Sequence, residues 1–176
     1  QKLREKIAQR LKDWIYAWDE ASLSGVIGKK LLKRKETVAA AESCTGGLLS
    51  SWLCTYPGAS RFYVGAVVSY ARNVKAHALG VPLALIKTHG EVSVPVARAM
   101  ARGARTALGC DWSVSITGIA GPGGGSANKP VGTVCFAVVG PGREEAVSKH
   151  FPAGGGRQDI QRQAALFAFD LLLNAM

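Results

Sequence analysis

The residues best suited to chemistry lie between Glu42 and Gly47, where the polar sequence ESCTGG separates two apolar segments. Residues 37–41 are small and apolar without helical spacing, which predicts a strand buried on both faces. Residues 48–53 carry apolar side chains at helical spacing. The first N–H groups of such a helix lack partners within it, and we expect those near Thr45–Gly47 to hold an oxyanion. Taken alone, this tight turn predicts a small-ligand site with Ser43 as the candidate nucleophile.

Ser43 needs a proton acceptor, because an unaided hydroxyl is a poor nucleophile at neutral pH. The conventional acceptors are the three histidines, His77, His89 and His150. Lys75 is a further candidate, since it follows a predicted strand over 61–70 whose end should lie beside Ser43. Tyr70, at the end of that strand, could relay a proton or orient the pair. From spacing alone, the simpler interpretation of Lys75 is a solvated lysine.

A second glycine-rich turn, 117–125, follows a predicted strand over 111–117. Ligands of open α/β sheets bind beyond the carboxyl ends of the strands, so this turn and the one at Ser43 could line one cleft. Gly118 and Gly121 would let the backbone approach a phosphate or ribose closely. The alternative is that these glycines serve only the turn geometry, and glycine spacing does not decide between the two.

The chain is basic, with 22 Lys and Arg against 12 Asp and Glu and a net charge of +10. Many of the basic residues precede residue 36, and no aromatic residue interleaves with the cluster over 29–35. A solvated basic face therefore explains the charge better than nucleic-acid binding. The positive field would still raise the local concentration of anionic substrates.

The four cysteines show no CxxC pairing and no histidine cluster accompanies them, so we expect neither a metal site nor a disulfide framework, and no cofactor. No apolar run is long enough for a membrane span, and the first residues do not resemble a signal peptide. These features favour a cytoplasmic protein of a reducing compartment, without membrane association.

The remaining elements follow from periodicity and turn residues. We expect helices over 2–19, 22–33, 73–79, 82–89, 94–108 and 159–175, a flexible joint at 154–156, and a hairpin of strands 133–139 and 144–151. Alternating strands and helices predict an α/β fold with helices on both faces of a mixed sheet. We expect a helical extension over 1–33 and the main domain over 34–176. The apolar stripe Leu3, Ile7, Trp14 and Trp18 offers a surface for a homo-oligomer.

Five sequence blocks together resemble the motif series of the CinA C-terminal domain family, the nicotinamide-nucleotide amidases. They are Ala41–Gly47 (AESCTGG), Ser69-Tyr70 with Lys75, His89-Gly90 before Val92-Ser93, Thr117–Pro122 (TGIAGP) and Lys129–Val134 (KPVGTV). Their order and spacing hold over 37–175, which is nearly all of the chain beyond the basic N-terminal region.

The resemblance implies a three-layer α/β/α sandwich that deamidates nicotinamide mononucleotide to nicotinate mononucleotide and ammonia. It implies Ser43 as nucleophile and Lys75 as general base, with Tyr70 and Thr117 assisting. The implied substrate-binding residues are Thr45, Gly46, Gly47, Gly118, Ala120, Gly121 and Arg157. Gly156 departs from the family, which has aspartate before that arginine. The alternative is a non-catalytic nucleotide-binding or competence- or damage-associated accessory domain, because some members are fused to a pyrophosphatase-type domain.

Overall fold

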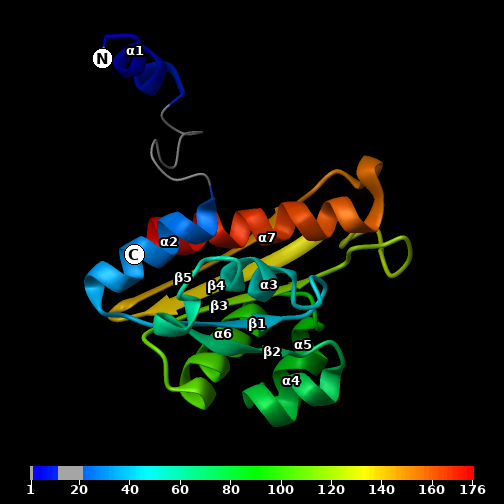
Figure 1. Cartoon of the computed structure of the whole chain (residues 1–176). Coiled ribbons are helices and arrows are strands. Elements are labelled where there is room, and N and C mark those ends of the chain that lie inside the picture. Colours follow the sequence, from blue (N-terminus) through cyan, green and yellow to red (C-terminus); the bar gives the residue numbers. More distant parts are fainter. Residues whose placement is uncertain (1, 12–21) are drawn as a thin grey trace.

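The computed structural model describes residues 2–11 and 22–176, in which a five-stranded mixed sheet lies between two layers of helices (Figure 1). The strands are β1 (Val38–Glu42), β2 (Tyr63–Val68), β3 (Trp112–Gly118), β4 (Thr133–Gly140) and β5 (Arg143–His150). Their order across the sheet is β2-β1-β3-β4-β5. The first three are parallel, and β4 and β5 add an antiparallel hairpin. The predicted α/β sandwich with a mixed sheet is therefore confirmed.

One face of the sheet is covered by α2 (Leu23–Arg34), α3 (Leu48–Cys54) and α7 (Gly156–Ala175). The other face is covered by α4 (Arg72–Leu79), α5 (Leu83–His89) and α6 (Val94–Leu108). Strand β1, which lies between β2 and β3, is buried along its whole length, and its small alanines alternate between the two layers. The core is thus split by the sheet, and the strand that leads to Ser43 is fixed from both sides.

A close helix contact places α4, the helix that carries Lys75. Gly103 of α6 lies against the end of α4, where a Cβ atom would come 1.9 Å from the carbonyl oxygen of Leu79. Only glycine allows this approach, because any larger residue would push α4 outward. The small residue in α6 therefore helps to set the depth at which Lys75 enters the protein.

The expected elements are present with small shifts in their ends. The strand expected over 61–70 is shorter, because Ala59–Arg61 forms a turn of 3-10 helix and β2 stops at Val68. The glycines of the expected joint at 154–156 form the end of a second 3-10 turn, Ala153–Gly155, and the first residue of α7. A third difference concerns the N-terminal helix. The structure describes it as α1 (Lys2–Leu11), and the expected continuation to residue 19, with Trp14 and Trp18, lies outside the described residues.

The N-terminal boundary of the domain stays a prediction. The structure packs α2 on α3 and α7, and Ile27 and Leu31 of α2 are fully buried in the same cluster as the sheet residues. Helix α2 therefore contributes to the core of the domain, although the sequence expectation assigned most of it to the extension over 1–33.

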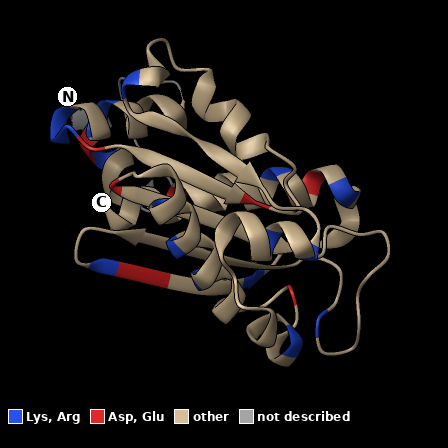
Figure 2. Ribbon diagram, turned by 90° about the horizontal axis from the view of Figure 1, so that it is seen from below, with Lys and Arg blue, Asp and Glu red and all other residues tan. Residues whose placement is uncertain are grey.

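Charged residues are dispersed over several helices, strands and loops of the fold (Figure 2). Within the described ranges, no helix has both the length and the apolar character needed to cross a bilayer.

Candidate active site

The carboxyl ends of β1, β2 and β3 meet at one edge of the sheet. Glu42, the last residue of β1, pairs with Val68 of β2 on one side and with Ile116 of β3 on the other. The segments that follow the three strands therefore start at the same level and face one another. They line a hollow of about 230 Å³. Of the predicted site residues, its walls contain Ser43, Tyr70, Lys75, Thr117, Gly118, Ala120 and Arg157.

Ser43 and Lys75, which are 32 positions apart in the sequence, are in direct contact in this hollow. The Nζ atom of Lys75 lies 3.0 Å from the Oγ atom of Ser43, and both residues are buried. The same nitrogen donates to the carbonyl oxygen of Ser69 at 2.7 Å and approaches that of Tyr70 at 3.3 Å. With two N–H groups directed at carbonyls, a neutral amine would turn its lone pair toward the hydroxyl of Ser43. The solvated-lysine interpretation is therefore wrong.

The surroundings of Lys75 favour loss of its proton. Burial is the largest effect and lowers the pKa of Lys75 below its ordinary value of 10.5. The carboxylate of Glu91, with Oε2 3.5 Å from Nζ, acts in the opposite direction and raises the pKa. Arg72 adds a smaller lowering effect. The net direction is downward, as a general base working near neutral pH requires.

Cys44, next to Ser43, is a second nucleophile type in the same hollow. Burial raises the pKa of its thiol to about 12. The thiolate is the reactive form of cysteine, so Cys44 is inert at neutral pH. The hydroxyl of Ser43, and not this thiol, is the group in hydrogen-bond contact with the amine of Lys75.

The turn that holds Ser43 is organised by Glu42, whose side chain is fully buried. Its carboxylate accepts hydrogen bonds from the backbone N–H groups of Gly47, Leu49 and Ser50 and from the hydroxyl of Ser50. A carboxylate inside the chain thus neutralises the N-terminus of α3. Glu42 therefore acts as the cap of α3.

This arrangement corrects the expectation for the oxyanion donors. The N–H of Gly47 is bound to Glu42, and the N–H of Gly46 donates to the carbonyl oxygen of Ser43 at 3.1 Å. Neither group is available to a ligand in this conformation, and Thr45, Gly46 and Gly47 do not line the hollow. Within the described chain, the turn N–H groups without another residue as acceptor are those of Cys44 and Thr45. The expectation is therefore wrong for Gly46, whose N–H binds Ser43, and for Gly47, whose N–H binds Glu42, while for Thr45 it stays a prediction.

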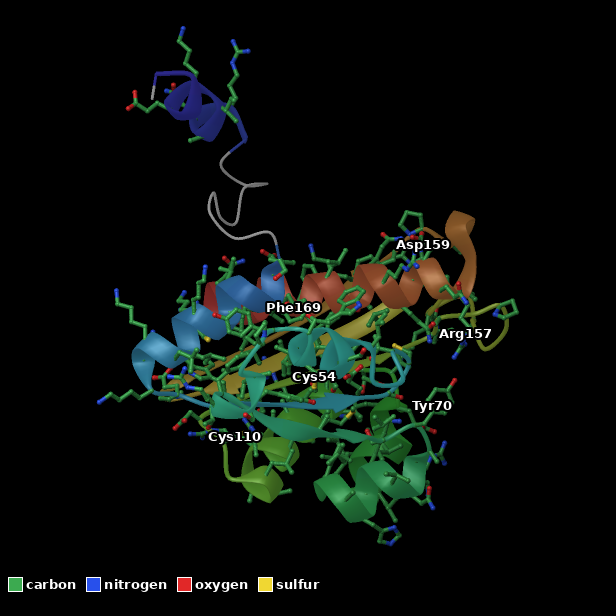
Figure 3. All side chains as sticks on the ribbon, in the orientation of Figure 1. Cys54, Tyr70, Cys110, Arg157, Asp159 and Phe169 are labelled. Carbon is green, nitrogen blue, oxygen red and sulfur yellow. The ribbon has the colours of Figure 1, made fainter. Side chains whose placement is uncertain are left out.

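Arg157 comes from the start of α7 and reaches the mouth of the hollow, where Figure 3 shows it near Tyr70. Its guanidinium donates to the hydroxyl of Tyr70 at 2.6 Å and to the carbonyl oxygen of Gly121 at 2.7 Å. Tyr70 is 59% exposed, and its phenol therefore meets Arg157 at the surface while its backbone carbonyl contacts Lys75. The presence of Gly156 has not displaced the arginine from the site.

Thr117 supports the opposite wall. Its hydroxyl donates to the carbonyl oxygen of Glu91 at 3.0 Å and so joins the end of β3 to the segment between α5 and α6. Gly118 follows in close contact with the turn, since a Cβ atom there would lie 3.0 Å from the sulfur of Cys44. These contacts place Thr117 and Gly118 in the wall of the site.

Three further residues hold the site and were missed from the sequence. Glu91 contacts Lys75. The amide of Gln161 donates to the carbonyl oxygen of Cys44 at 2.7 Å. Lys129 donates to the carbonyl oxygens of His89 and Val92 at 2.8 Å each. Glu91 and Lys129 fall inside or between quoted motif residues, and a search for charged residues in those blocks would have found them. Gln161 gives no sequence signal beyond its place on α7.

The described residues contain no group of three or more His, Cys, Asp or Glu side chains that could hold a metal ion.

Comparison with known proteins identifies the family of this chain. Residues 20–176 match the model of the CinA C-terminal domain. The chain belongs to this family. It is 48% identical over 157 residues to the CinA-like protein of Gloeobacter violaceus, covering 89% of this chain and 37% of that protein. It is 47% identical over 171 residues to the CinA-like protein of Mycobacterium marinum, covering 97% of this chain and 39% of that protein.

The chain thus spans about two fifths of the length of these CinA-like proteins. Solved structures match it over nearly their full length. A competence/damage inducible protein, CihA, from Agrobacterium tumefaciens superposes with a TM-score of 0.84 at 34% identity, covering 91% of this chain and 98% of that one. A CinA superfamily protein from Escherichia coli gives a TM-score of 0.84 at 32% identity, covering 92% and 95%.

Proposed function

We propose that this domain is an amidohydrolase that converts nicotinamide mononucleotide to nicotinate mononucleotide and ammonia through an acyl-enzyme on Ser43. The observation that carries the proposal is the buried 3.0 Å contact between the Oγ atom of Ser43 and the Nζ atom of Lys75. A nucleophile in hydrogen-bond contact with a desolvated base is the arrangement that covalent catalysis needs. The substrate follows from the family resemblance and from the cationic mouth of the hollow.

The first half-reaction forms the acyl-enzyme. The Oγ atom of Ser43 attacks the carboxamide carbon while neutral Lys75 takes the hydroxyl proton. The N–H groups of Cys44 and Thr45 are the proposed donors to the negative oxygen of the tetrahedral intermediate. When the carbon–nitrogen bond breaks, the ammonium of Lys75 returns its proton to the departing nitrogen, and ammonia leaves.

The second half-reaction releases the product. Lys75, neutral again, takes a proton from water, whose oxygen attacks the ester carbonyl. Collapse of this intermediate breaks the bond to Ser43, which recovers its hydroxyl proton from Lys75, and nicotinate mononucleotide is freed. The chemistry requires no electron transfer.

The charge at the mouth suits an anionic nucleotide. Arg157 presents a guanidinium beside Tyr70, and Gly121 brings its backbone to the same place. Guanidinium groups bind phosphate strongly because their N–H groups match the oxygens in pairs. We assign Arg157 to the phosphate end of the substrate, with the carboxamide toward Ser43.

An ammonia-release assay with nicotinamide mononucleotide tests the proposal. Ser43→Ala and Lys75→Met should each lower kcat by about a thousandfold or more, because each removes one half of the nucleophile–base pair. Ser51→Ala and Lys87→Met replace exposed residues of the same types and should keep native rates. Acid quenching during turnover, followed by mass spectrometry, should find the acyl group on the peptide that contains Ser43. Equal ammonia release by the native chain and Ser43→Ala would refute the mechanism.

The alternative is a non-catalytic domain that binds nucleotides. If calorimetry shows that the native chain binds nicotinamide mononucleotide but the assay finds no ammonia release, that alternative is supported and the proposed amidohydrolase activity is refuted.

A further inference from the structure

Glu91 brings a carboxylate to the amine of Lys75 from a different part of the chain. It lies in the loop between α5 and α6, and its Oε2 atom is 3.5 Å from the Nζ atom of Lys75. Its other oxygen accepts a hydrogen bond from the Nε atom of Arg72 at 3.1 Å. Glu91 is also part of the wall of the hollow. A hydroxyl, an amine and a carboxylate therefore follow one another from the buried nucleophile toward the solvent.

The loop that carries Glu91 is held in place from three directions. Lys129 binds the carbonyl oxygens of the residues at both sides, His89 and Val92, at 2.8 Å each. The hydroxyl of Thr117 binds the carbonyl oxygen of Glu91 itself at 3.0 Å. The hydroxyl of Ser93 binds the carbonyl oxygen of Gly90 at 2.9 Å. Such a fixed backbone is expected where the position of one side chain matters.

We propose that Glu91 is a positioning residue and that it completes a relay of three side chains, Ser43–Lys75–Glu91. This inference rests on the proposed function. The carboxylate stabilises the ammonium that forms when Lys75 takes the proton of Ser43, and it keeps Nζ directed at Oγ. In this it does for an amine what the acid of a serine–histidine–acid triad does for an imidazole. The proton itself passes only between Ser43, Lys75 and the leaving nitrogen, and it is not transferred to Glu91.

The charges around Lys75 oppose one another. Glu91 faces its amine from the loop before α6, and Arg72 lies one turn earlier on α4 itself. Cys44 faces it from the turn after β1 and is neutral at pH 7, while Tyr70 and Arg157 bind each other at the mouth. Glu91 raises the pKa of Lys75 and Arg72 lowers it. Burial, the largest effect, lowers this pKa as well. Removing the charge of Glu91 should therefore lower the proton affinity of Lys75, and removing the charge of Arg72 should raise it.

The test compares Glu91→Gln with Arg72→Gln. Glutamine keeps the shape of Glu91 and one acceptor oxygen, but it removes the charge and replaces the other oxygen with a donor. In protein labelled with ¹³C at the lysine Cε atoms, the Lys75 signal is identified by its loss in Lys75→Met. Its pKa should fall by about one unit in Glu91→Gln and rise in Arg72→Gln, because one pKa unit is a typical effect of a charge at this distance. Glu91→Asp retains the charge and should return the pKa toward the native value.

The rates should follow the same pattern. The acidic limb of the pH profile of kcat/KM reports protonation of the base in the free enzyme. It should move to lower pH in Glu91→Gln and to higher pH in Arg72→Gln. At the plateau, kcat of Glu91→Gln should fall about tenfold or more, since the ammonium in the transition state loses its partner, with little change in KM.

Two results would overturn the relay. The first is a Lys75 pKa that stays the same in both glutamine variants, and the second is a shift in the same direction in both. The NMR titration needs no turnover. A native chain that releases no ammonia would therefore refute the proposed function, while the titration would still decide whether Glu91 sets the proton affinity of Lys75.

Discussion

Arg157 and Tyr70 are 87 positions apart in the sequence, yet the Nη2 atom of the arginine lies 2.6 Å from the hydroxyl of the tyrosine. The first turn of α7 and the segment after β2 therefore meet at the mouth of the candidate site (Figure 3). The contact places a cation at the entrance, while Ser43 and Lys75 lie in the buried interior. Under the proposed function, recognition of the anionic phosphate is thus separated in space from the chemistry of the amide.

Replacing Arg157 should weaken substrate binding more than it slows the chemistry. Arg157→Met should raise KM for nicotinamide mononucleotide about tenfold or more with a smaller change in kcat, because a charge-assisted contact with phosphate is lost. KM for nicotinamide riboside, which lacks the phosphate, should change little. Arg162→Met, at an exposed arginine of the same helix, is the matched control. Steady-state kinetics on both substrates decide the matter, and an equal rise in KM for the riboside would remove Arg157 from phosphate recognition.

Lys75 should make the stability of the protein depend on pH. Its pKa is lowered in the folded state, so the unfolded chain binds this proton more tightly. The free energy of unfolding therefore rises with pH between the lowered pKa and the unfolded value near 10.5. Lys75→Met removes this contribution. Relative to the native chain, the variant should be most stable at and below neutral pH, and its advantage should shrink as the pH approaches that value.

Urea unfolding of the native chain and Lys75→Met at several pH values measures this difference. Lys87→Met replaces an exposed lysine and should follow the native chain at every pH. A stability difference between Lys75→Met and the native chain that does not vary with pH would show that burial does not perturb the amine.

Glu42 should be among the side chains most sensitive to substitution. Glu42→Gln keeps the size of the side chain but replaces one acceptor oxygen of a fully buried carboxylate with a donor. The carboxylate accepts from three backbone N–H groups and one hydroxyl, so we expect a loss of about 2–4 kcal/mol in the free energy of unfolding. Denaturant unfolding measures the loss. Ser50→Ala removes one of these donors and should cost only about 1 kcal/mol, and equal losses in the two variants would contradict the capping role.

The sequence predicted the parts of the site that depend on strand order. Ser43 and Lys75 follow neighbouring parallel strands, and such strands end at the same edge of a sheet. Glu91 could not be found in this way, because its contact with Lys75 depends on how the loop between α5 and α6 folds back over α4. The oxyanion expectation was wrong at Gly47 for another reason. The turn contains both a helix N-terminus and an acid able to cap it, and the sequence does not show which N–H groups the acid takes.

The substitution Gly156→Asp tests whether the departure from the family motif depends on the local backbone conformation. Its φ of 74° and ψ of −170° belong to a region that essentially only glycine adopts. Gly156→Asp, which restores the family residue, should therefore destabilise the protein by about 1–2 kcal/mol. Gly154→Asp is the matched control, since that glycine is exposed, lacks a positive φ and has free space around a Cβ atom. Denaturant unfolding compares the two variants. An aspartate at 156 that leaves stability unchanged would show that the start of α7 rearranges to the family geometry, and KM for nicotinamide mononucleotide would then report whether Arg157 moves with it.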